Sequence, residues 1–343
     1  MSVNLASILY HQWVPLPRVS SFSRPLTGRT VILTGGNVGL GFEAAKHLAS
    51  LGPARLIIAR RSTARGAEAV KKIQEAAKGK VGKVECWEVD EASFASVTAF
   101  GDRFEREGGG KLDLLVLNAA VGMYERQETA DGWELMLQVN HLSTCLLALR
   151  LLPFLSKARA DPPPPRIVIV DSGAHRWIKD LPEANTDAPS ILKLLSSKEN
   201  CAEEGKIQNW YPLTKLFNVF FCIELSERLS ADSAISMATV NPGFCRSSLA
   251  RHIRTWGFWF MTVLFARTTE MGSRTLVWTS VTKDLDGKSG KYTENCMVTE
   301  PGLFVMSEQG KKARGKVWDD TIEQLSLVDP EVPKIVKQYL RWE

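Results

Sequence analysis

The chain has 343 residues, of which 44% are hydrophobic and 24% are charged, close to the proportions of an average globular protein. It is too long for a small disulfide-stabilised module and too apolar for a disordered chain. The formal net charge of +5 comes from 43 basic and 38 acidic residues, and no nucleic-acid partner is expected without basic clusters. The nearest run, residues 311–316, is short and is interpreted as a solvated helix face.

Short β-branched runs alternate with longer stretches of helical periodicity along the chain. Strands are predicted at residues 30–34, 55–59, 84–89, 112–117, 167–170 and 234–240. Helices are predicted at residues 41–51, 65–77, 93–107, 131–155 and 210–229. This alternation predicts right-handed βαβ crossovers and one parallel sheet flanked by helices, an α/β fold of the doubly wound Rossmann type.

A glycine-rich turn, TGGNVGLG (34–41), joins the first strand to the first helix. Gly35 allows a sharp turn, Gly39 leaves room for a pyrophosphate near the backbone, and Gly41 lets helix and strand pack closely. The helix N-terminus offers free N–H groups to phosphates. A plain loop would accept the same glycines, but the strand before and the helix after favour a dinucleotide site. The predicted cofactor contacts here are Gly35, Asn37, Gly39, Leu40 and Gly41.

The second strand leads into Arg60 and Arg61, and no acidic residue lies between Leu51 and Gly66. An acidic side chain here would bind the ribose 2′-hydroxyl of NAD, whereas arginine pairs with the 2′-phosphate of NADP. NADP(H) is therefore predicted over NAD(H), with Arg60 as the leading phosphate ligand, and two surface arginines are the alternative. Asp90, at the end of the third strand, is placed to reach the adenine edge.

A phenol and an ammonium stand four residues apart in the predicted helix 210–229. Tyr211 and Lys215 share one helix face, and a nearby cation lowers the pKa of a phenol, which is ordinarily about 10. The tyrosine can then exchange a proton with a carbonyl or alcohol oxygen, which Ser172 can also hydrogen-bond. Asn140 is polar inside a buried helix, which implies a function for its amide.

In this order, the motifs resemble those of the short-chain dehydrogenase/reductase superfamily, over residues 26 to about 325. GFEAAKHL (41–48) and GKYTENC (290–296) are similar to its retinol-dehydrogenase-like branch, especially the fungal members found in secondary metabolism. The other matching segments are TGGNVGLG (34–41), Asp90, LNAA (117–120), VNHLST (139–144), IVIVDSGAH (167–175), YPLTK (211–215) and NPG (241–243).

The resemblance implies a role for each matching residue. Tyr211 would be the acid/base, and Lys215 would lower its pKa and hold the nicotinamide ribose. Ser172 would orient the substrate carbonyl, and Asn140 would anchor a water in the proton relay. Tyr211 would contact the cofactor as well, and further cofactor contacts would be Asn118, Ala119, Pro242, Gly243 and Ser247.

Two residues depart from the family pattern: Ala120 stands for the usual glycine, and Asp171 for a second serine before Ser172. The 39 positions from Ser172 to Tyr211 imply an inserted loop at about 180–205, near the cleft mouth. Although the length alone favours two domains, a single domain over 1–343 is predicted. It comprises an N-terminal arm (1–25), the core (26–297) and a C-terminal helical extension (298–343).

Cysteine usage and the N-terminus favour a cytoplasmic protein. The six cysteines are far apart and form no C-x-x-C pair, so free thiols and no metal site are expected. The N-terminus lacks a secretory signal pattern. The most hydrophobic window, residues 256–265, is too short to span a membrane, which takes roughly 20 residues, but peripheral membrane contact is left open.

The segment 249–265 carries five aromatic residues where this architecture covers the substrate cleft. A bulky lipophilic substrate is expected, with core packing or a dimer contact as the alternative. His141 and His175 are interpreted as structural, because the catalytic residues already supply proton transfer. The helix 210–229 is either a homodimer contact or part of the core.

The predicted function is NADPH-dependent interconversion of a ketone or aldehyde and an alcohol on a lipophilic small molecule, such as a polyketide or terpenoid. One alternative is a redox-neutral cyclase or isomerase on the same scaffold, which Asp171 and the inserted loop support. The other is a non-catalytic NADP(H)-binding scaffold, against which the complete catalytic set argues.

Overall fold

One eight-stranded sheet forms the centre of the computed structural model, which describes residues 12–62, 66–158, 163–202, 210–230, 232–246, 262 and 264–341. The strand order is β3-β2-β1-β4-β5-β6-β7-β8. Strands β1 to β7 run parallel, and β8 pairs antiparallel with β7. The strands are β1 (Thr30–Thr34), β2 (Arg55–Arg60), β3 (Lys83–Glu88), β4 (Leu114–Leu117), β5 (Arg166–Val170), β6 (Ser236–Asn241), β7 (Lys291–Glu294) and β8 (Met297–Thr299).

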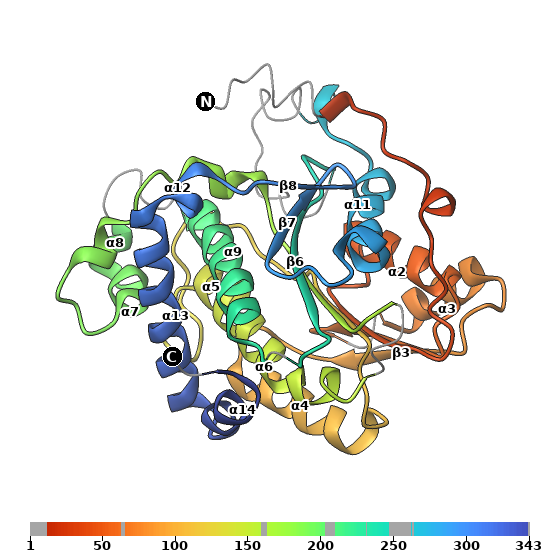
Figure 1. Ribbon diagram of the computed structural model, residues 1–343, viewed down its shortest axis with the longest axis horizontal. Helices are drawn as coiled ribbons and strands as arrows, with labels where there is room; N and C mark the ends of the chain where they lie inside the picture. The colour runs from red at the N-terminus through yellow and green to blue at the C-terminus, as the bar shows by residue number, and fades with distance from the viewer. Residues whose placement is uncertain are drawn as a thin grey trace.

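Helices cover both faces of the sheet, as predicted for the doubly wound fold (Figure 1). One face is covered by α2 (Gly39–Ser50), α3 (Gly66–Ala77) and α11 (Thr269–Val281). The other is covered by α4 (Phe94–Glu107), α6 (Ser143–Leu155) and α9 (Trp210–Arg228). The shorter elements include α5 (Leu135–Leu137), α7 (Ile191–Ser196), α8 (Lys198–Ala202), α12 (Leu303–Met306) and the 3-10 helices η1 (Val19–Ser21), η4 (Gly173–Trp177), η5 (Pro182–Asn185) and η8 (Lys283–Leu285).

Alternate residues of each central strand face opposite helix layers, which explains why these strands are apolar throughout. In β5, Ile167 and Ile169 pack toward α9, whereas Val168 and Val170 pack toward α11. The chain builds outward from β1 to β3 and then returns to place β4 beside β1. In open α/β sheets, ligands bind outside the carboxyl ends of the strands at such a reversal.

A further helical layer, α13 (Glu308–Val328) and α14 (Glu331–Tyr339), lies over α9 and α6 (Figure 1). Trp318 of α13 stacks on Phe221 of α9 with ring centres 5.6 Å apart, and Arg314 pairs with Glu224. The described part of the 180–205 insertion packs on α13. There, Asp320 accepts hydrogen bonds from the Leu192 N–H and the Ser190 hydroxyl. The alternative that α9 is a core helix is therefore confirmed.

Three predictions about elements need correction. The helix predicted at 131–155 begins at Leu135, because residues 128 and 134 form a β-bridge. A π-helical segment, Gln138–Leu142, interrupts it. Strands β7 and β8 were not predicted, because each is only a few residues long and they are separated by a tight turn.

The cysteines and the most apolar helix bear on the predictions about free thiols and membrane-spanning segments. All six cysteines are free. One helical stretch, residues 135–155, is long and apolar enough to cross a membrane, but nearly all of it is buried within the protein, as in a core helix. Leu16 of the N-terminal arm is buried, and its carbonyl accepts a hydrogen bond from Arg274 of α11. The division into arm, core and extension stays a prediction.

Candidate active site

The glycine turn between β1 and α2 is built by close backbone contacts. Gly35 and Gly39 have φ angles of +67° and +60°, which favour glycine. A Cβ atom at Gly41 would clash with the carbonyl oxygen of Gly35 and the side-chain amide of Asn118. The predicted role of Gly41 in close packing is thereby explained, and no larger residue fits there without movement.

The N-terminus of α2 has the features of an anion site. Its N-cap residue, Val38, makes no side-chain cap, and the first turn contains no acidic residue. The first N–H groups of the helix are therefore not capped by that side chain. A Cβ atom at Gly39 would meet nothing within 4 Å, and Asn37 lies in the turn itself. Leu40 packs beside Gly272 of α11.

Asn118 and Ala119, which follow β4, are fixed against the glycine turn. Both backbone N–H groups donate to the Thr34 hydroxyl, at 3.0 and 2.9 Å. The Asn118 side-chain amide donates to the Thr34 carbonyl at 2.9 Å. Thr34 was not singled out from the sequence, although its place between strand and glycines was a usable signal.

Arg60, the last residue of β2, is 8% exposed. Its Nε and Nη1 atoms have no hydrogen-bond partner in the part of the chain that the structure describes. Most buried polar groups are paired, so these two donors are suited to an anionic ligand. Arg61 is exposed, and Asp90 accepts a hydrogen bond from the Ala92 N–H at 3.0 Å.

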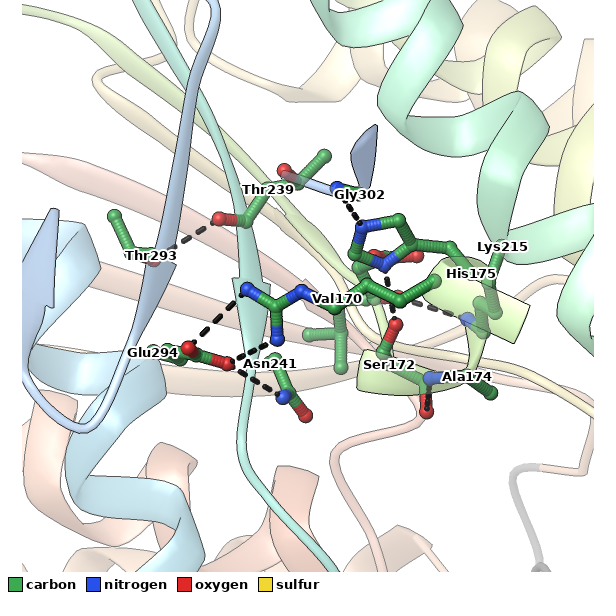
Figure 2. A network of polar contacts seen from close by, with 12 residues as sticks. Val170, Ser172, Ala174, His175, Lys215, Thr239, Asn241, Thr293, Glu294 and Gly302 are labelled. Carbon is green, nitrogen blue, oxygen red and sulfur yellow. Dashed lines mark hydrogen bonds and ion pairs between the residues drawn. The ribbon is translucent and has the colours of Figure 1, made fainter. Parts of the chain in front are cut away.

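The predicted catalytic side chains meet at the carboxyl end of β5. The Ser172 side chain lies near enough to the Tyr211 phenol to lower the pKa of that phenol. Lys215 is buried, and its Nζ atom donates to the Val170 carbonyl at 2.8 Å (Figure 2). The same atom lies 5.6 Å from the centre of the Tyr211 ring, within the range of a cation–π contact.

The expected lowering of the Tyr211 pKa by Lys215 is not found. Burial of the phenol and the negative charge of Asp171 raise its pKa above the ordinary value, and the opposing effect of the Ser172 side chain offsets only part of this. Burial lowers the pKa of Lys215 to about 8, against the opposing effect of Asp171. The sequence pattern missed this because it gives neither burial nor the side of the strand that Asp171 faces.

Asn140 lies in the π-helical segment and is 1% exposed. Its Oδ1 atom accepts from the Val121 N–H at 2.8 Å, and its Nδ2 atom donates to the Val121 carbonyl at 2.9 Å. Nδ2 also lies 3.1 Å from the Thr214 hydroxyl. Thr214 precedes Lys215 in α9, so the amide ties α9 to the chain after β4. Single-turn π-helical segments occur frequently at functional sites.

The turn after β6 carries two further predicted contacts. Gly243 has a φ of +80°, and its N–H donates to the Asn241 side chain at 2.9 Å. The Asn241 amide in turn donates to Glu294 of β7 (Figure 2). The carbonyl of Pro242 accepts from Arg267 at 3.4 Å. Ser247 and most of the aromatic segment 249–265 lie outside the described residues.

The two histidines beside the motifs are buried, as expected for structural residues. His141 Nε2 lies 3.0 Å from the Thr321 hydroxyl of α13, which itself donates to the Val317 carbonyl. His175 Nδ1 lies 2.7 Å from the Ser172 carbonyl, and His175 Nε2 accepts from the Gly302 N–H at 3.0 Å (Figure 2). Both imidazoles thus tie the site to the C-terminal extension.

Comparison with known proteins gives concordant results. Residues 29–177 match the short chain dehydrogenase family. The chain is 34% identical over 311 residues to short chain dehydrogenase/reductase dmxR8 of Cryptosporiopsis sp. (strain 8999), covering 89% of this chain and 93% of that one. It is 37% identical over 291 residues to short chain dehydrogenase sol3 of Alternaria solani, covering 83% and 90%.

The fold has counterparts among solved structures. An uncharacterized protein from Mycobacterium paratuberculosis superposes with a TM-score of 0.65 at 25% identity, over 91% of this chain and 98% of that one. The predicted similarity to fungal members is confirmed by the relatives above, whereas the retinol-dehydrogenase-like branch stays a prediction. The chain therefore belongs to the short-chain dehydrogenase/reductase family of nicotinamide-dependent oxidoreductases.

Proposed function

We propose that the protein is an NADP(H)-dependent reductase or dehydrogenase that interconverts a carbonyl group and an alcohol on an apolar small molecule. The observation that carries this proposal is the position of the Lys215 ammonium 5.6 Å from the centre of the Tyr211 ring, with the Ser172 side chain near the phenol. Two hydroxyls so arranged can bind one substrate oxygen, and one of them can donate its proton to that oxygen.

The residues at the carboxyl ends of β1, β2 and β4 fit a phosphorylated dinucleotide. The uncapped N-terminus of α2 would hold the pyrophosphate, and the unpaired donors of Arg60 would bind the 2′-phosphate. Asp90, Asn118, Ala119, Pro242, Gly243 and Ser247 remain proposed contacts. When bound, the nicotinamide donates or accepts the hydride.

The protonation states of the cofactor-free site suit reduction. Because the pKa of Tyr211 is raised, its hydroxyl is protonated at neutral pH and is ready to act as an acid. Ser172 orients the carbonyl oxygen beside that proton. Lys215, whose pKa is about 8, is mainly cationic at pH 7 and favours the phenolate that remains after transfer. Asn140 ties the chain after β4 to α9, which carries Tyr211 and Lys215.

The substrate class is proposed from the sequence and from the relatives. The aromatic content of residues 249–265 favours a bulky lipophilic molecule, and the fungal relatives favour a role in secondary metabolism. A panel of lipophilic ketones and aldehydes, incubated with NADPH, tests this proposal. The expected result is one alcohol formed for each NADPH oxidised.

Two other outcomes of the same assay would replace the proposal. Rearranged product without loss of NADPH would indicate a redox-neutral cyclase or isomerase. Tight binding of NADPH without conversion of any carbonyl or alcohol in the panel would indicate a non-catalytic scaffold.

A further inference from the structure

Asp171 is a buried carboxylate that immediately precedes Ser172 in the chain. It follows β5, and the alternation of that strand places residue 171 on the same face as Ile167 and Ile169, toward α9. Its side chain is 0% exposed, and its backbone N–H donates to the Val240 carbonyl at 2.7 Å. Neither carboxylate oxygen has a hydrogen-bond donor in the part of the chain that the structure describes.

His175 touches this carboxylate but does not neutralise it. Its Nδ1 atom lies 3.0 Å from Asp171 Oδ2 and 2.7 Å from the Ser172 carbonyl. Because the Gly302 N–H donates to Nε2 at 3.0 Å, Nε2 is unprotonated and the single ring proton is on Nδ1. That proton points to the Ser172 carbonyl, so the imidazole is neutral and leaves the charge of Asp171 unbalanced.

Other groups around the carboxylate come from η4, α9 and β7. Arg176 is cationic, but both of its Nη atoms bind Glu294, at 2.8 and 3.2 Å. A buried carboxylate needs a nearby cation, and Lys215 is the cation on the facing helix. Among the described residues, the titratable or charged groups around Asp171 are His175 and Arg176 from η4, Tyr211, Lys215 and Cys222 from α9, and Tyr292, with Glu294 behind Arg176, from β7.

We propose that Asp171 is a positioning residue whose buried negative charge keeps the Lys215 side chain protonated beneath Tyr211. It deepens the proposed function, because a cationic lysine is what the acid/base role of Tyr211 requires. Burial favours the neutral amine, and Asp171 is the described charge that opposes this effect on the Lys215 pKa. A serine at this position, as in much of the family, would not supply that charge.

Titration of Lys215 in the cofactor-free protein tests the proposal without any substrate. Lysine side chains are labelled with ¹³C at Cε, and the Lys215 signal is identified by its loss in Lys215→Arg. Wild type is expected to titrate near pH 8. In Asp171→Asn, the midpoint is expected to fall by about one pH unit or more. An unchanged midpoint would overturn the proposal.

Two further variants keep the result interpretable. Asp171→Ser replaces Asp171→Asn if the latter fails to fold, and the same fall is expected. Asp320→Asn removes another buried carboxylate, one that binds Ser190 and Leu192 away from the site, and should leave the Lys215 midpoint unchanged. An equal fall in Asp320→Asn would show that general destabilisation, and not Asp171, moves the midpoint.

The pH profile of carbonyl reduction gives a second readout. Asp171 raises the pKa values of both Tyr211 and Lys215, so its removal should move the alkaline limb of kcat to lower pH by a similar amount. The substrate panel described above tests the proposed function separately. A failure to find any reducible carbonyl would therefore count against that function and leave the lysine titration to decide on Asp171.

Discussion

The two halves of the sheet build their parts of the site in different ways. Around β1, β2 and β4 the site consists largely of backbone groups, set by glycines within a few residues of one another. Around β5, β6 and β7 it consists of buried side chains held by contacts distant in sequence. Asn140 and Thr214 are 74 positions apart, His175 and Gly302 are 127 apart, and His141 and Thr321 are 180 apart.

This difference separates cofactor binding from catalytic geometry. A change near the glycine turn acts locally, on the groups proposed to bind the cofactor phosphates. A change in α13 acts through α9, which carries both Tyr211 and Lys215, and should alter stability and turnover before it alters cofactor affinity. The predictions below test this separation.

The largest expected effect is on the packing of α13 against α9. Trp318 is 6% exposed and stacks on Phe221, so Trp318→Ala should lower the free energy of unfolding by about 3–5 kcal/mol. Leu327→Ala, on the exposed side of the same helix, should change it by less than about 0.5 kcal/mol. If urea unfolding gave the same loss of free energy for Trp318→Ala and Leu327→Ala, α13 would not support α9.

His141 should make the protein sensitive to acid. Burial lowers its pKa from 6.5 to about 4, so the folded state holds it neutral while the unfolded state takes up a proton. Stability is therefore fully present above pH 6.5 and is lost as pH falls toward 4, by about 3 kcal/mol in total. His141→Asn should remove most of this slope. If the free energy of unfolding fell equally with pH in wild type and His141→Asn, groups other than His141 would cause the acid sensitivity.

Gly41→Ala tests the part of the site around β1, β2 and β4, which is built largely of backbone groups. The added methyl group would clash with the Gly35 carbonyl. This overpacking should lower the free energy of unfolding by about 1–3 kcal/mol and weaken NADPH binding by at least about tenfold. Gly315→Ala in α13 meets nothing within 4 Å and should be neutral or slightly stabilising. Calorimetric binding constants that do not differ between the two variants would contradict the proposed pyrophosphate site.

Arg60→Ala should lower affinity for NADPH by about 10–100-fold, the usual range for losing a hydrogen bond to a charged group, and change affinity for NADH little. Arg61→Ala, at an exposed position, should have the smaller effect. Equal affinity of the wild-type protein for NADPH and NADH would contradict the proposed 2′-phosphate contact.

The same division explains what could be predicted from the sequence. The β-branched runs and the TGGNVGLG turn predicted the first six strands and the glycine turn, because their periodicity and conformational needs are local. The π-helical segment at Asn140 was missed, because contacts with Val121 and Thr214 decide it. The raised pKa of Tyr211 was missed for a similar reason: it depends on burial and on Asp171, which only the packed structure brings to α9.

Kinetics of Tyr211→Phe, with Tyr339→Phe as the matched control, test whether Tyr211 donates the proton in carbonyl reduction. The variant loses only the phenol oxygen, so kcat for carbonyl reduction should fall by about 10²–10⁴-fold. The dissociation constant of NADPH should stay within about twofold, because the glycine turn and Arg60 are untouched. Turnover retained in Tyr211→Phe would contradict the account.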